Sequence, residues 1–254
     1  MPRPQNDFVR QETQWRRLQE DELRAADGWL AVAALVWLAE GNNPLPEPYR
    51  TFGSFRMHRG KVDWIPAGGA ARPVRPETEP PVDLVEIGDA RAQVLKRGKR
   101  IGVRIRDPKS PARTGFGGRI WYPADPAWRI DAEFHPYPKG RTLAITNVLG
   151  DVSNVPCPGY VTFTIGNVRC RLEPQETPNG LFVVFTDKTA GKGTYPAGRF
   201  LETSLPADGR VVLDFNRAVN PPCAFTDFAT CPLPPRANRL PIAVPAGERY
   251  TGHH

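Results

Sequence analysis

The sequence predicts a mainly β protein, an antiparallel β-sandwich or barrel in two β-rich lobes, preceded by one α-helix. The 254 residues include 29 prolines and 23 glycines, whereas the two together average about 12 % of a globular chain. Short segments with the alternating pattern of a strand recur at intervals of about 8 to 15 residues, with Gly, Pro, Asn or Asp between them. No helical segments alternate with these strands. The pattern therefore favours antiparallel sheets over a parallel α/β sheet.

The N-terminal piece, residues 1–28, is predicted to form the helix. From residue 6 to residue 26 the chain is rich in Arg, Gln, Glu and Leu, contains no Pro or Gly, and spaces a few large apolar residues as a loose stripe. Asp27-Gly28 is a typical stop signal for a helix. We expect a polar helix on the outside of the fold, held there by Trp15.

Residues 29–118 are predicted to form the smaller lobe. The segment from residue 29 to residue 38 is apolar and ends at a turn cluster, which fits a buried strand or a brief helix. Val32, Val36 and two tryptophans favour the strand. Further strands are expected at residues 51–58, 61–65, 83–87 and 92–95, with a Pro- and Gly-rich loop at residues 66–81.

The densest run of basic residues, residues 96–106, also has the pattern of a strand. Apolar and basic residues alternate within it: Ile101, Val103 and Ile105 with Arg100, Arg104 and Arg106. This period of two predicts a half-buried strand with a charged outer face. Lys and Arg outnumber acids 34 to 27, a net charge of +7, which is compatible with an anionic partner or with simple solubility. The sequence disfavours nucleic acid as the partner.

Residues 119–254 are predicted to form the larger lobe. The first strand alternates Ile130, Ala132 and Phe134 with Asp131, Glu133 and His135. Later strands are expected at residues 142–148, 160–165, 168–172, 181–186, 199–203 and 210–215.

The four cysteines are predicted to be free thiols in a cytoplasmic protein. They are few for this length, and no charged segment followed by an apolar one begins the chain as in a secretory signal. The longest apolar run, residues 29–39, is far shorter than the roughly 20 residues that a membrane-spanning helix needs. No membrane partner is expected.

The stretch from Asp214 to Arg239 departs most from ordinary strand and turn composition. It contains Asp-Phe-Asn-Arg (214–217), Asn-Pro-Pro-Cys-Ala-Phe-Thr (220–226), Ala-Thr-Cys-Pro-Leu-Pro-Pro (229–235) and Asn-Arg-Leu (238–240). With residues 121–129 and 194–201, these motifs resemble the bacterial and archaeal family called domain of unknown function 1684, over most of the chain up to Glu248. The resemblance implies no established activity. The chain departs from the family's pattern at Val219, usually an aromatic, and in a shortened segment at residues 44–50.

The residues of this stretch suggest a site built around Asp214 and Arg199. In a strand at residues 210–217, Asp214 and Asn216 share one face. If this strand pairs with the one at 199–203 through a turn at 206–209, Arg199 meets Asp214. An Arg beside a carboxylate can orient a polar substrate or a water, and we assign both residues a catalytic role. The alternative is a structural ion pair that locks a Pro-rich loop against the sheet.

Further polar residues of the stretch are predicted to bind the ligand: Asn216, Arg217, Asn220, Asn238, Arg239 and Cys223. The alternative for the asparagines is turn capping, and the alternative for Cys223 is a small buried hydrophobic residue. Catalysis by a thiol would need a base and a positive environment. Cys223 and Cys231 are too far apart for the usual paired zinc ligands and no histidine pattern accompanies them, so no metal and no cofactor are predicted.

The sequence thus predicts a ligand-binding β protein that acts on a small polar or anionic molecule in a pocket of the C-terminal lobe, with hydrolase-like catalysis as one form of that function. The alternative is a non-catalytic interaction module that uses the Pro-rich C-terminal segment and the basic strand as a docking surface. A homodimer is compatible with either. Nucleic-acid binding is the third hypothesis.

Overall fold

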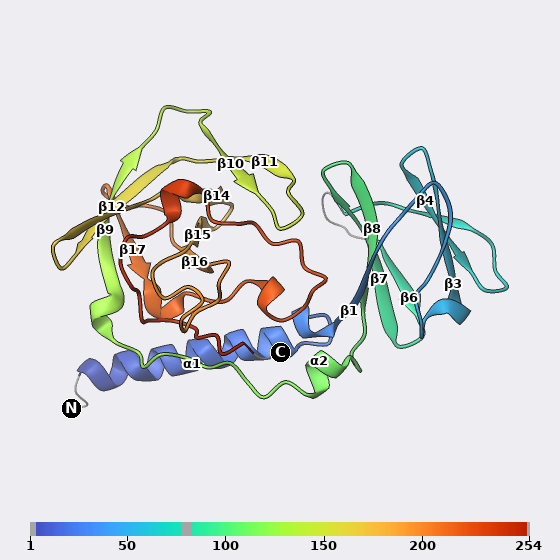
Figure 1. Ribbon diagram of the computed structural model, residues 1–254, viewed down its shortest axis with the longest axis horizontal. Coiled ribbons are helices and arrows are strands. Elements are labelled where there is room, and N and C mark those ends of the chain that lie inside the picture. The colour runs from blue at the N-terminus through green and yellow to red at the C-terminus, as the bar shows by residue number, and fades with distance from the viewer. Residues whose placement is uncertain (1–3, 78–82, 253–254) are drawn as a thin grey trace. The chain divides into compact units, whose positions relative to one another are not determined.

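The computed structural model describes residues 4–77 and 83–252 and shows a mainly β protein with one long N-terminal helix (Figure 1). The chain divides into two compact units. Unit 1 comprises Met1–Glu20, Gly117–Ala224 and Ala229–His254, and unit 2 comprises Asp21–Phe116 with Phe225–Phe228. The division at residues 28 and 118 into separate domains stays a prediction.

The helix α1 (Pro4–Arg24) forms where the sequence predicts one. Its Trp15 ring meets the Trp121 ring edge-on, with the ring centres 5.8 Å apart, and the Arg217 guanidinium lies 5.3 Å from the Trp15 ring centre. Glu12, only 1 % exposed, accepts hydrogen bonds from Arg217 at 2.8–3.2 Å. The polar helix is therefore held on unit 1 by Trp15 and a charged pair. Within the described ranges, no helix is both long and apolar enough to cross a bilayer.

Unit 1 is a sandwich of two open antiparallel sheets with a separate ribbon (Figure 1). The larger sheet has the order β13-β12-β9-β17, with β9 (Arg129–Pro136), β12 (Gly159–Ile165), β13 (Val168–Leu172) and β17 (Arg210–Asp214). The smaller sheet is β14 (Gln175–Thr177), β15 (Gly180–Phe185) and β16 (Arg199–Thr203), and the ribbon is β10 (Thr142–Thr146) with β11 (Val152–Pro156). Phe215, fully buried, lies between Phe163 of the larger sheet and Phe185 of the smaller, so both sheets share one core.

Unit 2 is a second sandwich of two four-stranded sheets. One has the order β1-β8-β7-β6, with β1 (Val32–Trp37), β6 (Leu84–Ile87), β7 (Ala90–Arg97) and β8 (Arg100–Arg106). The other has the order β2-β3-β4-β5, with β2 (Gly41–Pro44), β3 (Gly53–His58), β4 (Lys61–Pro66) and β5 (Arg72–Val74). Phe55 and Trp64 from the second sheet pack with Val94, Val103 and Ile105 from the first in one core. A single helical turn, α2 (Pro111–Thr114), is capped by Ser110.

Short 3₁₀ turns connect several of these strands: Trp29–Ala31, Arg50–Phe52, Pro126–Trp128, Phe215–Arg217, Pro222–Ala224 and Arg236–Asn238. Three of the six lie in the C-terminal stretch with the unusual composition. They fix its backbone without adding it to a sheet.

The strand β8 confirms the predicted half-buried strand, with one exception on its outer face. Val103 and Ile105 are fully buried in the core of unit 2, as the alternation predicts. Arg104, on the opposite face, is only 3 % exposed, and its guanidinium lies 4.8 Å from the Trp29 ring centre. The charged face is thus partly covered by an aromatic ring, on which an arginine stacks favourably.

Among the described residues, four strands were not predicted from the sequence: β2, β5, β11 and β14. Three of them form sheet edges, and β11 is half of the two-stranded ribbon. Edge strands need pairing on one side only, so they tolerate the Pro, Gly and Asn that argue against a central strand. The strand β5 lies inside the predicted loop at residues 66–81, of which residues 78–82 lie outside the described residues.

Candidate functional site

The predicted contact between Arg199 and Asp214 is wrong, because β16 and β17 belong to different sheets. Arg199 lies opposite Phe185 of β15, and Asp214 lies opposite Arg129 of β9. The turn at residues 206–209 carries the chain from one sheet of the sandwich to the other and does not close a hairpin.

Arg199 is instead the centre of a buried hydrogen-bonded cluster that includes Asp187 and the carbonyls of Val244 and Ala246, which we call the structural lock. Its Nη2 lies 2.9 Å from Oδ2 of Asp187, and both side chains are 1 % exposed. The guanidinium also donates to the carbonyl oxygens of Val244, at 3.0 Å, and Ala246. Burial lowers the pKa of Arg199, and Asp187 opposes that shift. The other oxygen of Asp187 accepts from the amides of Thr189 and Val244. These bonds tie the C-terminal segment to the sheet. The structural alternative expected such an ion pair with Asp214, whereas the partner is Asp187.

Asp214 has partners of its own. Its Oδ2 accepts a hydrogen bond from Arg129 at 2.9 Å, and its Oδ1 accepts from the amide and the side chain of Asn216. Asn216 also bridges to both the amide and the carbonyl of Asp125. The carboxylate therefore caps the turn that follows β17.

The remaining predicted residues are distributed over separate contacts. Arg217 pairs with Glu12, Asn220 binds the Arg249 carbonyl, and Asn238 binds the backbone of Glu173 and Val184. The backbone of Arg239 bridges to Thr186. Asn216 and Asn238 are at most 1 % exposed, so neither can reach a ligand without a rearrangement. Ligand binding by this set stays a prediction, and none of its members lines either of the two cavities described below.

Beside Asn220 lies a buried carboxylate that the sequence did not single out. Glu248, 1 % exposed, accepts from the Asn220 amide at 2.7 Å and from Arg119 at 2.6 Å. Burial raises the pKa of Glu248 to about 7, although Arg119 opposes the shift.

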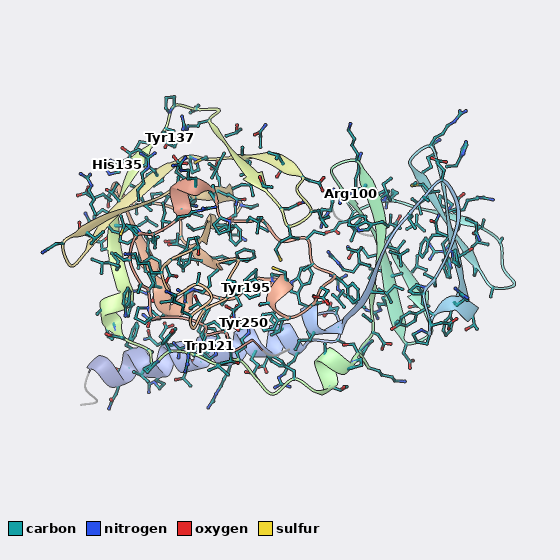
Figure 2. All side chains as sticks on the ribbon, viewed as in Figure 1. Arg100, Trp121, His135, Tyr137, Tyr195 and Tyr250 are labelled. Atoms are coloured by element: carbon teal, nitrogen blue, oxygen red, sulfur yellow. The ribbon has the colours of Figure 1, made fainter. Side chains whose placement is uncertain are left out.

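Cys223 and Cys231 lie together. The Cys223 amide donates to the sulfur of Cys231 at 3.2 Å. The Tyr195 hydroxyl donates to the Cys223 carbonyl at 3.0 Å, and the Tyr195 ring meets the Tyr250 ring edge-on at 4.9 Å; Figure 2 labels both tyrosines. The bond from the Cys231 thiol lowers the pKa of Cys223 to about 7, against the opposing effect of burial.

His135 is the one histidine of the described strands that hydrogen-bonds a hydroxyl (Figure 2). That hydroxyl belongs to Thr162, one of the residues that line a cavity of about 400 Å³: Asp131, Glu133, Thr162, Phe163, Thr164, Arg169 and Arg210. Its Nε2 lies 2.8 Å from Thr162 Oγ1 and 3.7 Å from Glu133. A nucleophilic triad needs the carboxylate on the other ring nitrogen, where it would orient the base. Here both partners share one nitrogen, so the geometry does not support such a mechanism.

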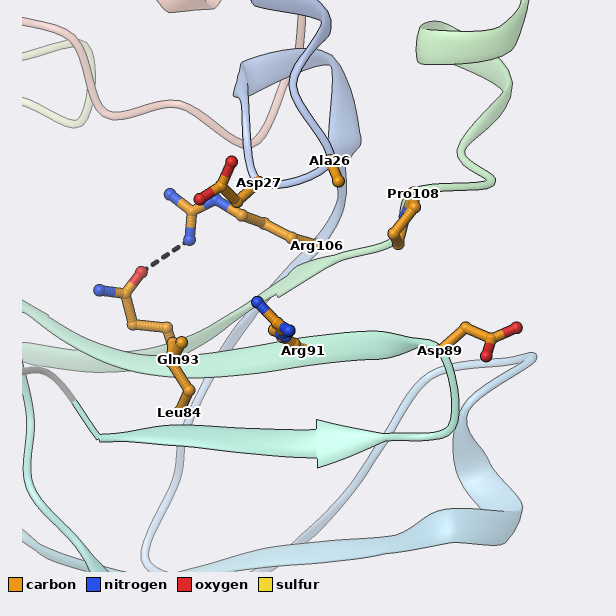
Figure 3. A pocket seen from close by; sticks show the side chains of 8 residues that line it. All are labelled: Ala26, Asp27, Leu84, Asp89, Arg91, Gln93, Arg106 and Pro108. Carbon is orange, nitrogen blue, oxygen red and sulfur yellow. Dashed lines mark hydrogen bonds between the residues drawn. The ribbon is translucent and has the colours of Figure 1, made fainter. Parts of the chain in front are cut away.

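A larger cavity, of about 510 Å³, lies on the outer face of the β1-β8-β7-β6 sheet in unit 2 (Figure 3). We call it the arginine pocket. It is lined by Ala26, Asp27, Leu84, Asp89, Arg91, Gln93, Arg106 and Pro108.

Two arginines dominate this pocket. Arg91 of β7 and Arg106 of β8 lie directly opposite each other in the antiparallel register, and Figure 3 shows both rising from the same side of the sheet. Arg106 donates to Gln93 at 2.7 Å, and its Nε is buried without a hydrogen-bond partner among the described residues. Burial lowers the pKa of Arg106, with Glu77 and Asp27 opposing. The alternation of residues 96–106 places Arg106 on a charged face, but nothing in the sequence sets the register between the two strands, so Arg91 was not predicted.

Among the described residues, no three His, Cys, Asp or Glu side chains gather as a metal site would require. The prediction of no metal and no cofactor stays a prediction.

A family model described as "Protein of unknown function (DUF1684)" matches residues 114–249, more than half of the chain. The chain belongs to this family. The predicted resemblance is confirmed, although the match begins at residue 114 and not at the N-terminal helix. The arginine pocket therefore lies outside the segment that matches the DUF1684 model.

A solved structure is similar to this DUF1684 protein: the solution NMR structure of the uncharacterized protein from gene locus rrnAC0354 of Haloarcula marismortui. The two are 31 % identical over 56 % of this chain and 81 % of that chain, with a TM-score of 0.46. No curated protein matches.

Proposed function

We propose that this DUF1684 protein binds a small anion, a carboxylate or a phosphate compound, in the arginine pocket. The observation that carries the proposal is the direct opposition of Arg91 and Arg106 at the wall of a cavity. The site lies in the smaller lobe, whereas the sequence placed the pocket in the C-terminal lobe. The class of ligand is the one that the sequence predicts.

An anion would offset a repulsion that the fold itself creates. Directly opposite side chains in antiparallel strands have Cβ atoms about 4.5–5.5 Å apart, and like charges in that arrangement destabilise the sheet. Arg106 has a neutral hydrogen-bond partner in Gln93, and Arg91 makes no hydrogen bond or ion pair within residues 4–77 and 83–252. The positive charge of Arg91 is therefore still available to a ligand.

The pocket lining holds two carboxylates beside the two arginines, and one of the carboxylates has a partner outside the lining. Asp89, in the lining, pairs at 2.5 Å with Lys109, which lies outside the lining. Asp27 is the other carboxylate of the lining, and together with Glu77 it acts on Arg106. Each guanidinium presents a planar fork that matches two oxygens of a carboxylate or phosphate.

The size of the cavity suits a small molecule, because such sites commonly measure about 300–1,000 Å³. The lining holds neither a hydroxyl nor a thiol nucleophile and no histidine. We therefore propose binding without chemistry at this site, in the cytoplasm. Catalysis at Asp214 and Arg199, the Pro-rich docking surface and a homodimer stay predictions.

Isothermal titration of the full chain with inorganic phosphate and with citrate, at low ionic strength, tests the proposal. A hydrogen bond to a charged group contributes about 1.5–3 kcal/mol, so two arginines support a Kd of roughly millimolar or below. Arg91→Gln keeps most of the side-chain length and removes the charge. We expect it to weaken binding by about 10- to 100-fold, which is one such hydrogen bond.

Arg72→Gln is the matched control, since Arg72 is an exposed strand arginine of the same unit outside the pocket. It should leave binding unchanged. Equal weakening by both substitutions would show a general charge effect, and no effect of Arg91→Gln would place the anion elsewhere. Either result, or no binding by the unsubstituted protein, overturns the proposal.

A further inference from the structure

A second site stands apart from the anion-binding proposal, at Cys223 and Cys231 in unit 1. Each lies in a backbone segment that proline stiffens. Cys223 follows two prolines, Pro221 and Pro222, and sits in the 3₁₀ turn Pro222–Ala224, while Pro232 follows Cys231 directly. Because proline fixes its own φ, these segments hold the two cysteines in place.

The sulfur of Cys231 lies against the backbone of Cys223. It accepts a hydrogen bond from the Cys223 amide at 3.2 Å, and both cysteines are free thiols. Cys223 is partly exposed, and Cys231 is 5 % exposed. A reactant from solution therefore reaches Cys223 first, with Cys231 directly behind it.

We propose that Cys223 and Cys231 form a thiol–disulfide exchange site that is oxidised by small-molecule disulfides. The Cys223 thiolate attacks one sulfur of the disulfide R–S–S–R, forms a mixed disulfide and releases one R–S⁻. The sulfur of Cys231 then attacks Cys223, forms the intramolecular disulfide and releases the second R–S⁻. The two protons lost by the cysteines are taken up by the two leaving thiolates. Two protein thiols are oxidised and one small disulfide is reduced to two thiols.

The surroundings favour Cys223 as the attacking group. Its pKa is lowered to about 7 by the bond from the Cys231 thiol, so about half of it is thiolate at neutral pH. An attacking thiol works best when its pKa lies near the ambient pH. The amide that donates to the Cys231 sulfur also favours negative charge there when Cys231 attacks in turn.

The other two cysteines, Cys157 and Cys170, serve as internal controls for the reactivity of Cys223. Cys157 and Cys170 are buried, 3 % and 2 % exposed, and burial raises the pKa of each. A cysteine of that kind is inert. The four thiols of one molecule thus form two classes, and the inference predicts reaction in only one of them.

The test is incubation of the reduced full chain with oxidised glutathione at pH 7 without oxygen, followed by acid quenching and mass spectrometry of peptides. We expect the loss of two hydrogens and a cross-linked peptide that joins Cys223 to Cys231. Cys231→Ser should stop the reaction at the first step, with one glutathionyl group on Cys223. Cys223→Ser should give neither product.

A purely structural pair of thiols would behave differently. If the Cys231→Ser variant carries glutathione on Cys157 or Cys170 as fast as on Cys223, the proposal is wrong. It is equally wrong if the unsubstituted protein forms no link between Cys223 and Cys231. Alkylation of Cys223 by iodoacetamide in the unsubstituted protein should show a midpoint near pH 7 and run at least about tenfold faster than that of Cys157 at that pH. A midpoint above pH 9 would mean that Cys223 is almost fully protonated at neutral pH, which would contradict the proposed attack by its thiolate.

Discussion

Replacing Asp187 by Asn tests whether Arg199 is a structural lock. The substitution keeps the size of the side chain and removes the charge that faces Arg199 at 2.9 Å, where both groups are 1 % exposed. A guanidinium left buried without its counter-charge costs about 3–5 kcal/mol, a large part of the roughly 5–15 kcal/mol that keeps a typical domain folded. For a chain of this size, that loss lowers Tm by about 6–20 °C.

The assay is thermal and urea unfolding followed by circular dichroism, with an exposed ion pair as the control. Arg210 and Asp131 form a bond of 2.7 Å, but their side chains are 47 % and 60 % exposed, and such pairs contribute at most about 1 kcal/mol. Asp131→Asn should therefore change Tm only slightly. If Asp187→Asn also costs less than about 1 kcal/mol, the lock does not exist. Arg199→Met added to Asp187→Asn should recover part of the loss, because no buried charge then remains unpaired.

Three further predictions concern stability. Burial raises the pKa of Glu248 to about 7, so between pH 4.5 and 7 the folded protein keeps a proton that the unfolded chain has lost, and the free energy of unfolding falls by on the order of 3 kcal/mol as pH rises through this range. Urea titrations across the range should show this fall, and Glu248→Gln should remove it. Gly198→Ala should lower the free energy of unfolding in urea by several kcal/mol, since Gly198 has φ +101° and a Cβ there would lie 2.4 Å from the Phe185 carbonyl oxygen. Gly166 has φ +57° and open space around it, so Gly166→Ala should lower it by only about 1–2 kcal/mol. Equal losses would contradict the packing argument. Trp15→Ala should lower stability by about 2 kcal/mol, less than a fully buried tryptophan, because Trp15 is half-buried against Trp121; a normal urea midpoint would show that the helix is held by other contacts.

The strands were predictable because their side chains alternate. The expected strands at residues 168–172 and 199–203 have the observed bounds, and Val211 and Leu213 lie in the core as the period of two requires. The strand expected to continue to residue 217 ends at Asp214, where the 3₁₀ turn Phe215–Arg217 begins. This signal is local, since each strand carries its own buried and exposed faces. It fails at β2 and β5, where edge positions leave less of the strand to bury.

The alternation of side chains did not predict the pairing of the strands. The strands β16 and β17 are neighbours in sequence, and a short turn rich in Asp and Gly joins them, which favours a hairpin. The structure places them in opposite sheets because each has an apolar face that the other sheet of the sandwich covers. The partner of Arg199 is Asp187, in the loop after β15. Asp187 accepts hydrogen bonds from the amide and hydroxyl of Thr189, two residues on, and an Asp followed by a Thr at this spacing is a sequence signal for a structural aspartate in a turn.

The contrast between Arg199 and the arginine pocket separates a lock from a site in this protein. Arg199 is surrounded by a carboxylate and two carbonyls, which leaves it no charge to offer a ligand. Arg91 and Arg106 lie opposite each other instead. Arg106 donates to the neutral amide of Gln93 and feels the carboxylates of Glu77 and Asp27, whereas Arg91 has no hydrogen-bond or ion-pair partner among the described residues. A fold can keep two like charges in register only at a cost in stability. Replacing Arg91 by Glu would therefore turn the repulsion into an attraction, raise the unfolding free energy by about 0.2–1 kcal/mol and abolish anion binding. A gain in stability that comes with a loss of binding is the result that a site predicts and a lock does not.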